Sequence, residues 1–307
     1  MIKSKYFNYL VICDEFLIEE LGFTIFNFVE SLDVKNKTLT KLTVITSPSL
    51  IEYVHGKLSF LQGKIASLRI LSSKNEGLFK GMNHLSSFAY LRFFVCEYFE
   101  EDVSEVLYFD VDCWVKKDLT HLFSIELNSC LACGVLEFSS DIEKRRLGLS
   151  VSDYYVNTGV LLINVQKWRE EKIQSKLIEC YNENFDKLLW ADQDVMNILF
   201  RGRWLLLDSK YNSLRQFQYD PYVIHFNTSS KPWHFGDDNK WSRSYMNNRI
   251  YFEKDWLPIN TSFKTIFKSF NKNTADYYFH FRFTIKCLVL LIKKKNFINK
   301  KKIEKRK

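Results

Sequence analysis

The segment VLYFDVDCWV, residues 106–115, joins an apolar run to two aspartates that stand one residue apart. Its first four residues are β-branched, aliphatic or aromatic, which is typical of a buried strand. Asp110 and Asp112 follow at the carboxyl end of this strand. Burying a charge is costly unless a partner offsets it, so a strand that only packs would not carry this pair. The pair therefore indicates a functional site at a strand end.

On both sides of this segment, short apolar runs alternate with longer segments whose apolar residues recur at helical spacing. Strands are expected at residues 6–13, 41–47, 64–71, 105–110, 129–138, 158–164, 204–212 and 222–227, and helices at 16–32, 50–61, 84–99, 165–185 and from 192. Alternation of this kind predicts an α/β fold with a mostly parallel central sheet and crossover helices. From about residue 245 the pattern is helical, aromatic and increasingly basic.

The net charge of +8 resides in one segment of the chain. Residues 293–307 contain nine Lys or Arg and one Glu, so the other 292 residues sum to zero. A neutral globule with a basic tail predicts an anionic partner for the tail. A membrane surface fits best, because the tail follows an apolar stretch; a solvated tail is the alternative. Nucleic acid is disfavoured, since no recognition motif accompanies the basic residues.

The seven cysteines are odd in number and lie mostly within apolar runs, which predicts free thiols in a reducing compartment. Cys130 and Cys133 form a single CxxC without a second pair, so a zinc or redox role is disfavoured. The N-terminus does not have the pattern of a signal peptide, and no run of about 18 apolar residues predicts a spanning helix.

The two aspartates suit a hard divalent cation. At spacing i, i+2 on an extended segment their side chains share a face, and carboxylate oxygens are ligands that Mg²⁺ and Mn²⁺ prefer. A D-x-D taken alone is more often a pair of exposed turn acids. The buried strand before Asp110 favours the metal site instead.

Residues 106–123 resemble the metal-binding core of family 8 glycosyltransferases. Four further blocks follow in the order of that family, at residues 155–169 (YVNTGVLLINVQKWR), 192–197 (DQDVMN), 207–212 (LDSKYN) and 223–233 (VIHFNTSSKPW). The resemblance covers about residues 6–240. It implies a GT-A nucleotide-diphospho-sugar transferase domain over residues 1–244. Residues 245–307 form a helical, aromatic and basic C-terminal region, whose composition predicts attachment to a membrane surface.

The resemblance also implies the site residues. Asp110, Asp112 and His225 would bind Mn²⁺ or Mg²⁺, and Gln193 and Asp192 would be catalytic. The UDP-sugar would contact a larger set that includes both catalytic residues: Asp14, Arg92, Val111, Asn157, Thr158, Asp192, Gln193 and Lys231. Two positions depart from the family pattern, because Phe16 replaces an Asn and Thr228 replaces a Gly.

The expected function is transfer of a galactose or glucose from UDP to a saccharide, with retention at the anomeric carbon. Glutamine is a poor nucleophile, so front-face displacement is favoured; a double displacement would need Asp192 or Asp194. The expected acceptor is a lipid-linked lipopolysaccharide or lipooligosaccharide core, at the inner face of the cytoplasmic membrane. Alternatives are a protein or soluble-sugar acceptor, or a non-catalytic sugar-nucleotide-binding protein. A hydrolase is disfavoured, since these paired acids do not flank a glycosidic bond.

Overall fold

The computed structural model describes residues 5–82, 86–137, 141–214, 220–227, 231–234, 240–254, 256–258 and 285–292. The chain divides into two compact units, Met1–His225 and Phe226–Lys307. The functional division after residue 244 stays a prediction. The basic segment 293–307 and Thr228 lie outside the described residues.

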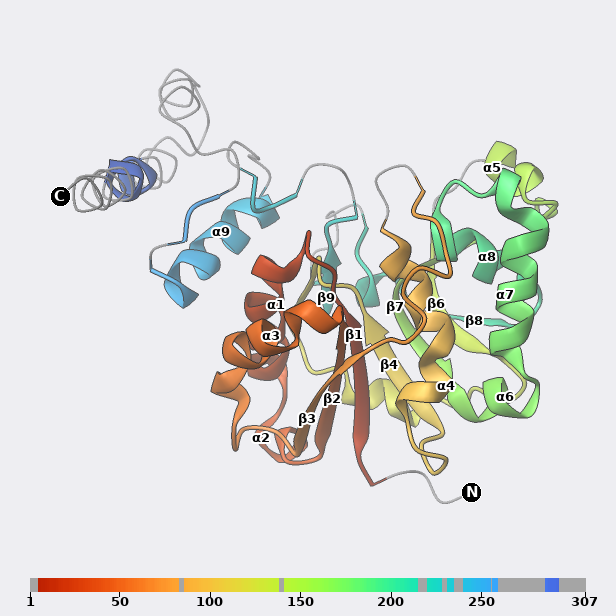
Figure 1. The fold of residues 1–307 in the computed structure, drawn as a ribbon, viewed down its shortest axis with the longest axis horizontal. Helices are drawn as coiled ribbons and strands as arrows, with labels where there is room; N and C mark the ends of the chain where they lie inside the picture. Colours follow the sequence, from red (N-terminus) through yellow and green to blue (C-terminus); the bar gives the residue numbers. More distant parts are fainter. Residues whose placement is uncertain are drawn as a thin grey trace. The chain divides into compact units, whose positions relative to one another are not determined.

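The first unit is built on a seven-stranded sheet with the strand order β3-β2-β1-β4-β7-β6-β8 (Figure 1). The strands are β1 (Phe7–Ile12), β2 (Thr40–Thr46), β3 (Ser67–Ser72), β4 (Glu105–Phe109), β6 (Ala132–Leu136), β7 (Val156–Asn164) and β8 (Trp204–Leu206). Strands β1 to β4 are mutually parallel, as is the pair β6 and β8. Strand β7 runs antiparallel to both of its neighbours. The prediction of a mostly parallel central sheet in an α/β fold is confirmed.

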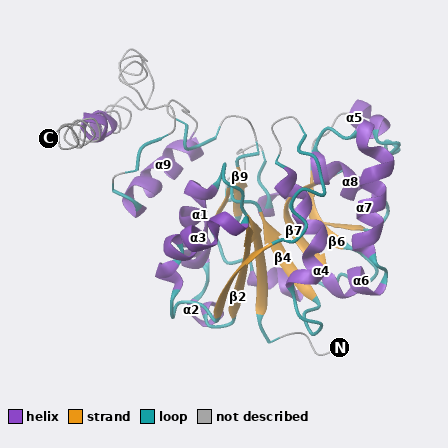
Figure 2. Cartoon of the chain, viewed as in Figure 1, coloured by secondary structure: helices purple, strands orange, loops and turns teal. Residues whose placement is uncertain are grey.

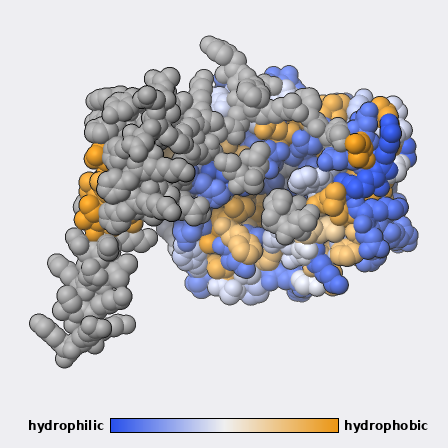
Figure 3. Space-filling model, turned by 90° about the horizontal axis from the view of Figure 1, so that it is seen from above, coloured by the Kyte–Doolittle hydropathy of each residue, from blue (hydrophilic) through white to orange (hydrophobic). Residues whose placement is uncertain are grey.

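Helices cover both faces of this sheet (Figure 2). The α-helices of the first unit are α1 (Ile18–Ser31), α2 (Val34–Lys37), α3 (Ile51–Lys57), α4 (Val95–Tyr98), α5 (Asp141–Arg146), α6 (Val165–Glu170), α7 (Ile173–Asn184) and α8 (Ala191–Leu199). The described part of the first unit also contains six short 3-10 helices: η1 (Pro48–Leu50), η2 (Ser59–Leu61), η3 (Ser87–Phe94), η4 (Thr120–Ser124), η5 (Phe185–Lys187) and η6 (Ser209–Tyr211). Charged side chains of α5 contribute to the hydrophilic edge where Figure 1 places α5 and α7 (Figure 3).

Two hydrophobic cores lie on the two faces of the sheet. One core includes residues of α1 and α3, and the other includes residues of η3, α4, α6, α7 and α8. Successive side chains of a strand point to opposite faces, so Leu10 joins the second core while Tyr9 and Val11 join the first. This double burial explains why β1 and β4 are nearly continuous apolar runs instead of alternating ones.

The helix expected over 16–32 is confirmed as α1, but some of the other predicted helices are broken into shorter ones. Residues 87–98 form η3 and then α4, where one helix was expected over 84–99. The helix expected over 165–185 is interrupted at Lys172, whose φ of +53° is left-handed, and so becomes α6 and α7. The apolar periodicity identified the buried face of each segment but did not reveal these breaks. One left-handed residue, or a change from 3-10 to α-helix, barely changes the spacing of the apolar residues in the sequence.

A two-stranded antiparallel sheet joins the segment after β4 to a distant part of the chain. Strand β5 (Cys113–Val115) pairs with β9 (Val223–His225), and Cys113 lies directly opposite His225. The neighbouring Ser213 bridges to Ile224. This pairing brings His225 beside the aspartates that precede β5.

The second unit contains α9 (Lys240–Phe252) and a helix over residues 285–292. In α9 the buried Arg249 donates to Glu253 one turn later, at 2.7 Å. Among the described residues, no helix combines the length and the apolar character that crossing a bilayer requires.

Candidate functional site

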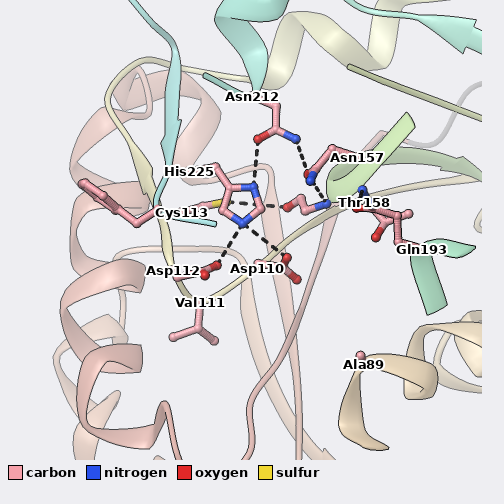
Figure 4. A network of polar contacts seen from close by, with 12 residues as sticks. Ala89, Asp110, Val111, Asp112, Cys113, Asn157, Thr158, Gln193, Asn212 and His225 are labelled. Carbon is pink, nitrogen blue, oxygen red and sulfur yellow. Dashed lines mark hydrogen bonds and ion pairs between the residues drawn. The ribbon is translucent and has the colours of Figure 1, made fainter. Parts of the chain in front are cut away.

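Asp110, Asp112 and His225 converge on one point (Figure 4). Asp110 follows β4, Asp112 precedes β5, and His225 ends β9. His225 Nε2 lies 3.2 Å from Asp112 Oδ1 and 3.6 Å from Asp110 Oδ2. Neighbouring oxygen and nitrogen ligand atoms of a six-coordinate Mg²⁺ or Mn²⁺ lie about 3 Å apart. The three predicted metal ligands are thus together, with a spacing and a chemistry that fit a divalent cation.

Gly159, in β7, leaves the space that the His225 ring fills. A Cβ on Gly159 would lie 3.0 Å from Asp110 Oδ2 and 2.5 Å from His225 Nδ1. Cys113 is a further group at this point: its Sγ, the Asp112 carboxylate and a ring nitrogen of His225 lie within 4.8 Å of one another. The thiol donates to the Gly159 carbonyl at 3.6 Å. Cys113 and Gly159 lie within the segments 106–123 and 155–169 that resemble the family, but neither was predicted as a site residue.

Arg92 links the metal ligands to the predicted sugar-binding acid. Its Nη2 donates to Asp110 Oδ1 at 3.1 Å, and its Nε lies 3.1 Å from Asp192 Oδ2. Nη1 donates to the Thr158 carbonyl at 2.6 Å, and Nη2 also donates to the Tyr108 hydroxyl at 3.0 Å. The guanidinium is buried and most of its donors bind protein groups. Arg92 therefore positions Asp110 and Asp192, and its contact with a donor sugar stays a prediction.

Asp110 uses its two oxygens differently. Oδ1 accepts from Arg92 and from Tyr108 in a short hydrogen bond, while Oδ2 faces His225. Hydrogen bonds to one carboxylate oxygen fix the rotation of the group. Arg92 and Tyr108 thereby direct Oδ2 toward the point where the metal ligands converge.

Asp192 lies in the first turn of α8 and is almost fully buried. Burial raises the pKa of Asp192 to about 6, against the lowering effect of Arg92 and with a further raising effect of Asp110. Its Oδ2 also accepts from the Thr158 hydroxyl at 3.2 Å. A carboxylate held in this way has limited freedom to move.

Gln193 is fixed at both ends of its amide. Oε1 accepts from the Thr158 backbone N–H at 3.2 Å, and Nε2 donates to the Tyr155 hydroxyl at 3.3 Å. Thr158 and Tyr155 both lie at the start of β7, so one strand end holds Gln193 and contacts Asp192. The two predicted catalytic residues thus lie beside Thr158, a predicted donor-binding residue.

A line of polar groups leads away from His225. His225 Nδ1 lies 3.0 Å from Asn212 Oδ1, and Asn212 Nδ2 donates to Asn157 Oδ1 at 2.8 Å. Asn157 Nδ2 in turn donates to Glu137 Oε2 at 2.9 Å. Asn157 was predicted, but Asn212 and Glu137 were not. Asn212 is the last residue of the segment 207–212 that resembles the family, and this position could have identified it. Nothing in the sequence pointed to Glu137.

Asp194 is fully buried and accepts from several donors. Oδ1 accepts from the Tyr155 hydroxyl, and Oδ2 accepts from the N–H groups of Leu189 and Trp190 at 2.7 and 2.9 Å. Arg146 Nη1 donates to Oδ2 at 3.0 Å. These contacts hold the turn that leads into α8, whose first residue, Ala191, has a left-handed φ of +47°. Asp194 therefore supports the turn that carries Asp192 and Gln193.

The predicted base-binding residue Asp14 lies at the end of β1. Its Oδ1 accepts from the backbone N–H groups of Phe16 and Leu17, at 3.0 and 3.2 Å. Phe16, which departs from the family pattern, is 76% exposed. Val111 is buried, and its carbonyl accepts from the Thr24 hydroxyl of α1 at 2.6 Å.

Lys231 belongs to the second unit. Its Nζ donates to the Phe226 carbonyl at 2.6 Å. The other predicted site residues lie in the first unit. The contact of Lys231 with a diphosphate stays a prediction.

Comparisons with known proteins agree with this architecture. The family model described as glycosyl transferase family 8 matches residues 18–237. Glycosyltransferase GlyA of Streptococcus pneumoniae is 31% identical over 194 residues, 60% of this chain and 26% of the relative. Glycosyltransferase GlyF of the same organism is 29% identical over 228 residues, 69% of this chain and 53% of the relative. The chain therefore spans only a quarter to a half of the length of these two relatives.

The solved structures share the fold. Galactosyltransferase LgtC, in complex with donor and acceptor sugar analogs, has a TM-score of 0.68 at 21% identity, over 84% of this chain and 98% of that one. GlyE of S. pneumoniae has a TM-score of 0.60 at 18% identity, over 84% of this chain and 66% of that one. At these identities the likeness concerns the fold, which is the GT-A fold. Because the family model covers most of its length, the chain belongs to glycosyl transferase family 8.

Proposed function

We propose that this chain is a metal-dependent, retaining glycosyltransferase that moves a hexose from UDP to a saccharide. The observation that carries the proposal is that Asp110 Oδ2 and Asp112 Oδ1 lie 3.6 and 3.2 Å from His225 Nε2. Arg92 connects this group to Asp192, and Thr158 contacts both Asp192 and Gln193. A cation site and a set of polar side chains for a sugar are thus parts of one hydrogen-bonded network.

In this proposal Asp110, Asp112 and His225 hold Mn²⁺ or Mg²⁺, the ion types that mixed carboxylate and imidazole ligands accept. When bound, such an ion neutralises negative charge on the diphosphate leaving group. Asp14 accepts from the uracil N–H through Oδ2, since Oδ1 is used by the backbone of residues 16 and 17. Asp192 and Asn157 bind sugar hydroxyls, and Lys231 adds positive charge to the diphosphate side.

We favour front-face displacement. The acceptor oxygen forms its bond to the anomeric carbon on the face from which the diphosphate leaves, and the acceptor proton passes to a leaving phosphate oxygen. Gln193 lines the opposite face, with its amide held by Thr158 and Tyr155. The contacts of Asp194 support this choice, because a nucleophile there would have to give up donors from four backbone or side-chain groups.

For the acceptor we propose a lipid-linked saccharide of the lipopolysaccharide or lipooligosaccharide type, with the chain attached peripherally to a cytoplasmic membrane surface. The helix over 285–292 supports this, because Ile285, Val289 and Ile292 are exposed at spacings of four and three residues and share a face. The basic segment 293–307 follows it directly. An apolar face next to basic residues is the composition that binds anionic lipid surfaces.

A protein or soluble-sugar acceptor is the second candidate. The names of the streptococcal relatives specify no acceptor, so they favour neither candidate. Sedimentation of the full chain with vesicles separates the two. Binding to phosphatidylglycerol vesicles that is lost in high salt and absent with phosphatidylcholine favours the lipid-linked acceptor. A chain that stays in the supernatant with both lipids counts against it.

The reaction itself is tested by UDP release. The full chain is incubated with UDP-galactose, UDP-glucose, UDP-N-acetylglucosamine or UDP-N-acetylgalactosamine, each with Mn²⁺ and with EDTA. Slow hydrolysis of a UDP-hexose that needs Mn²⁺ and is lost in Asp112→Ala is the expected result. If no donor turns over and calorimetry detects no Mn²⁺-dependent UDP binding, the enzyme proposal is wrong and a non-catalytic role replaces it.

A further inference from the structure

We propose that Asn212 and Glu137 are positioning residues that hold His225 in its metal-binding tautomer. The inference deepens the proposed function and rests on the metal site described above. It concerns which nitrogen of the imidazole carries a proton. A neutral imidazole has one N–H and one lone pair, and only the nitrogen with the lone pair can bind a metal ion.

The relevant contacts form one continuous line of four side chains. His225 Nδ1 meets Asn212 Oδ1 at 3.0 Å, Asn212 Nδ2 meets Asn157 Oδ1 at 2.8 Å, and Asn157 Nδ2 meets Glu137 Oε2 at 2.9 Å. His225, Asn212 and Asn157 are all buried, at 3%, 1% and 5% exposure. Buried polar groups of this kind are rarely left without a hydrogen bond, so the direction of each bond matters.

The direction of the line is set at Asn157 by two separate groups. Glu137, as a carboxylate, can only accept, so the NH₂ end of the Asn157 amide must face it. The backbone N–H of Gly159 can only donate, and it donates to Asn157 Oδ1 at 2.9 Å. Both constraints give the same orientation of the Asn157 amide, although they act on opposite ends of it.

The orientation of Asn212 follows. Asn157 Oδ1 accepts, so the NH₂ end of Asn212 faces Asn157 and its carbonyl oxygen faces His225. A carbonyl oxygen has no hydrogen to give, so His225 Nδ1 is the donor in that contact. The proton of the neutral imidazole is therefore on Nδ1, and the lone pair is on Nε2.

This assignment has a direct consequence for metal binding. Nε2 is the atom that lies 3.2 Å from Asp112 Oδ1 and 3.6 Å from Asp110 Oδ2. Without Asn212, those carboxylates would favour a proton on Nε2, where it would occupy the position of the cation. Histidine ligands in metal sites commonly have the other ring nitrogen held by an acceptor, and loss of that acceptor weakens metal binding about 10–100-fold.

The test uses Mn²⁺ alone as the probe, with the full chain, and measures free Mn²⁺ by electron paramagnetic resonance. Asn212→Leu removes the acceptor and is expected to weaken Mn²⁺ binding at least about tenfold. Asn212→Asp keeps an acceptor for Nδ1–H but loses the N–H that Asn212 donates to Asn157. It is therefore expected to bind Mn²⁺ more weakly than the unmodified chain and more tightly than Asn212→Leu. Glu137→Gln keeps the shape of the side chain, but its amide can donate as well as accept. A smaller loss of Mn²⁺ affinity than in Asn212→Leu is expected, because the Gly159 N–H still orients Asn157.

The matched control is Asn36→Leu, which removes another buried amide with side-chain partners, far along the chain from His225. Asn36 donates to Asp118 and Thr120, each at 2.8 Å. This variant is expected to lose stability without loss of Mn²⁺ affinity. Equal Mn²⁺ affinity in Asn212→Leu and the unmodified chain overturns the inference while the metal site stands. If the unmodified chain itself does not bind Mn²⁺, the proposed metal-dependent function fails.

A second measurement reads the tautomer directly and does not depend on metal binding. With ¹⁵N-labelled histidine, the metal-free chain is expected to show a hydrogen-bonded Nδ1–H for His225, assigned by its absence in His225→Gln. That resonance should be lost or shifted in Asn212→Leu and kept in Asn212→Asp and Asn36→Leu. An unprotonated Nδ1 in the unmodified chain overturns the inference.

Discussion

Gly159 and His225 are packed so closely that no side chain fits between them. A Cβ on Gly159 would come within 2.5 Å of His225 Nδ1 and closer still to Cε1. The backbone of Gly159 also accepts from the Asp110 N–H at 2.9 Å, which ties the end of β4 to β7. Contacts below 3.0 Å force a displacement, and here the atom displaced belongs to a ring with several fixed contacts. A glycine in β7 is therefore a condition for the position of His225, a predicted metal ligand.

Gly159→Ala is expected to displace the His225 ring and weaken Mn²⁺ binding by at least about tenfold, comparable to the loss of a supporting contact of a metal ligand. The measurement is a Mn²⁺ titration of the full chain, together with thermal unfolding. The stability loss should be about 1–3 kcal/mol, as for other overpacked core positions.

Gly56→Ala is the matched control for this substitution. Gly56 lies in α3, and a Cβ there would meet nothing within 4 Å. Alanine in a helix should stabilise by up to about 1 kcal/mol and leave Mn²⁺ affinity unchanged. If the Gly159→Ala variant binds Mn²⁺ as tightly as the unmodified chain does, the His225 ring has room to move and the glycine is not required.

Arg92 is expected to be essential because it pairs with two carboxylates at once. Arg92→Met leaves Asp110 and the buried Asp192 without their cation, and removing one partner of a buried ion pair costs about 3–5 kcal/mol. Urea unfolding measures this loss, and UDP release should fall by about 100-fold or more, since both carboxylates lose their orientation.

The control is Arg69→Met, which breaks the exposed ion pair of Arg69 with Glu100. Exposed pairs contribute about 0.2–1 kcal/mol, so this variant should unfold nearly as the unmodified chain does. Similar stability losses in the two variants would mean that the guanidinium of Arg92 is not the link between the two carboxylates.

The sequence predicted the sheet and most of the residues that converge at the proposed metal site, because those features follow from local patterns. Strands buried on both faces, such as β1 and β4, appear as continuous apolar runs, and Asp110 and Asp112 mark a strand end. His225 came from the family resemblance; composition gave no reason to place it there. Its proximity to Asp112 depends on the pairing of β5 with β9, which joins residues more than 100 positions apart.

The supporting residues could not be predicted in the same way. Tyr108 lies within β4 and Glu137 directly follows β6, and a single polar residue at such a position has no periodic signal. The antiparallel direction of β7 was also not evident, because buried parallel and antiparallel strands share the same apolar composition. Contacts of this kind are decided by packing in three dimensions.

Asp118 is expected to stabilise the fold at neutral pH but not in acid. Its carboxylate accepts from the Asp33 N–H at 2.8 Å, the Asn36 amide at 2.8 Å and the Thr120 N–H at 2.7 Å. Burial alone would raise the pKa of Asp118, but these hydrogen bonds outweigh it and lower the pKa. A lowered pKa in the folded state gives stability that is present above the unfolded value, about 3.9, and is lost as the pH falls through the folded value.

Asp118→Asn should therefore lower the free energy of unfolding most at pH 7, with a difference that narrows as the pH falls below about 4, near the unfolded pKa. Urea unfolding at pH 7, 5 and 3.5 measures the trend. Asp102→Asn, at an exposed position, is the control. A difference that is constant across this range would contradict the assigned role of the carboxylate.

Asp194 is expected to act by position and not as a nucleophile. It is fully buried, and its oxygens accept from Tyr155, Leu189, Trp190 and Arg146. Asp194→Asn should destabilise the chain by about 3–5 kcal/mol, because Arg146 loses its buried partner. UDP release should fall only partially where the variant is folded, since no covalent step depends on the carboxylate.

Intact mass spectrometry separates the two roles of Asp194. The unmodified chain, incubated with UDP-hexose and Mn²⁺ without an acceptor, should gain no hexosyl mass, because front-face displacement forms no glycosyl-enzyme. Asp186→Asn, an exposed acid in η5, is the control for stability and should behave as the unmodified chain does. A hexosyl adduct on the peptide that contains Asp194 would establish a double displacement, and the hydrogen bonds to that carboxylate would then have to open during turnover.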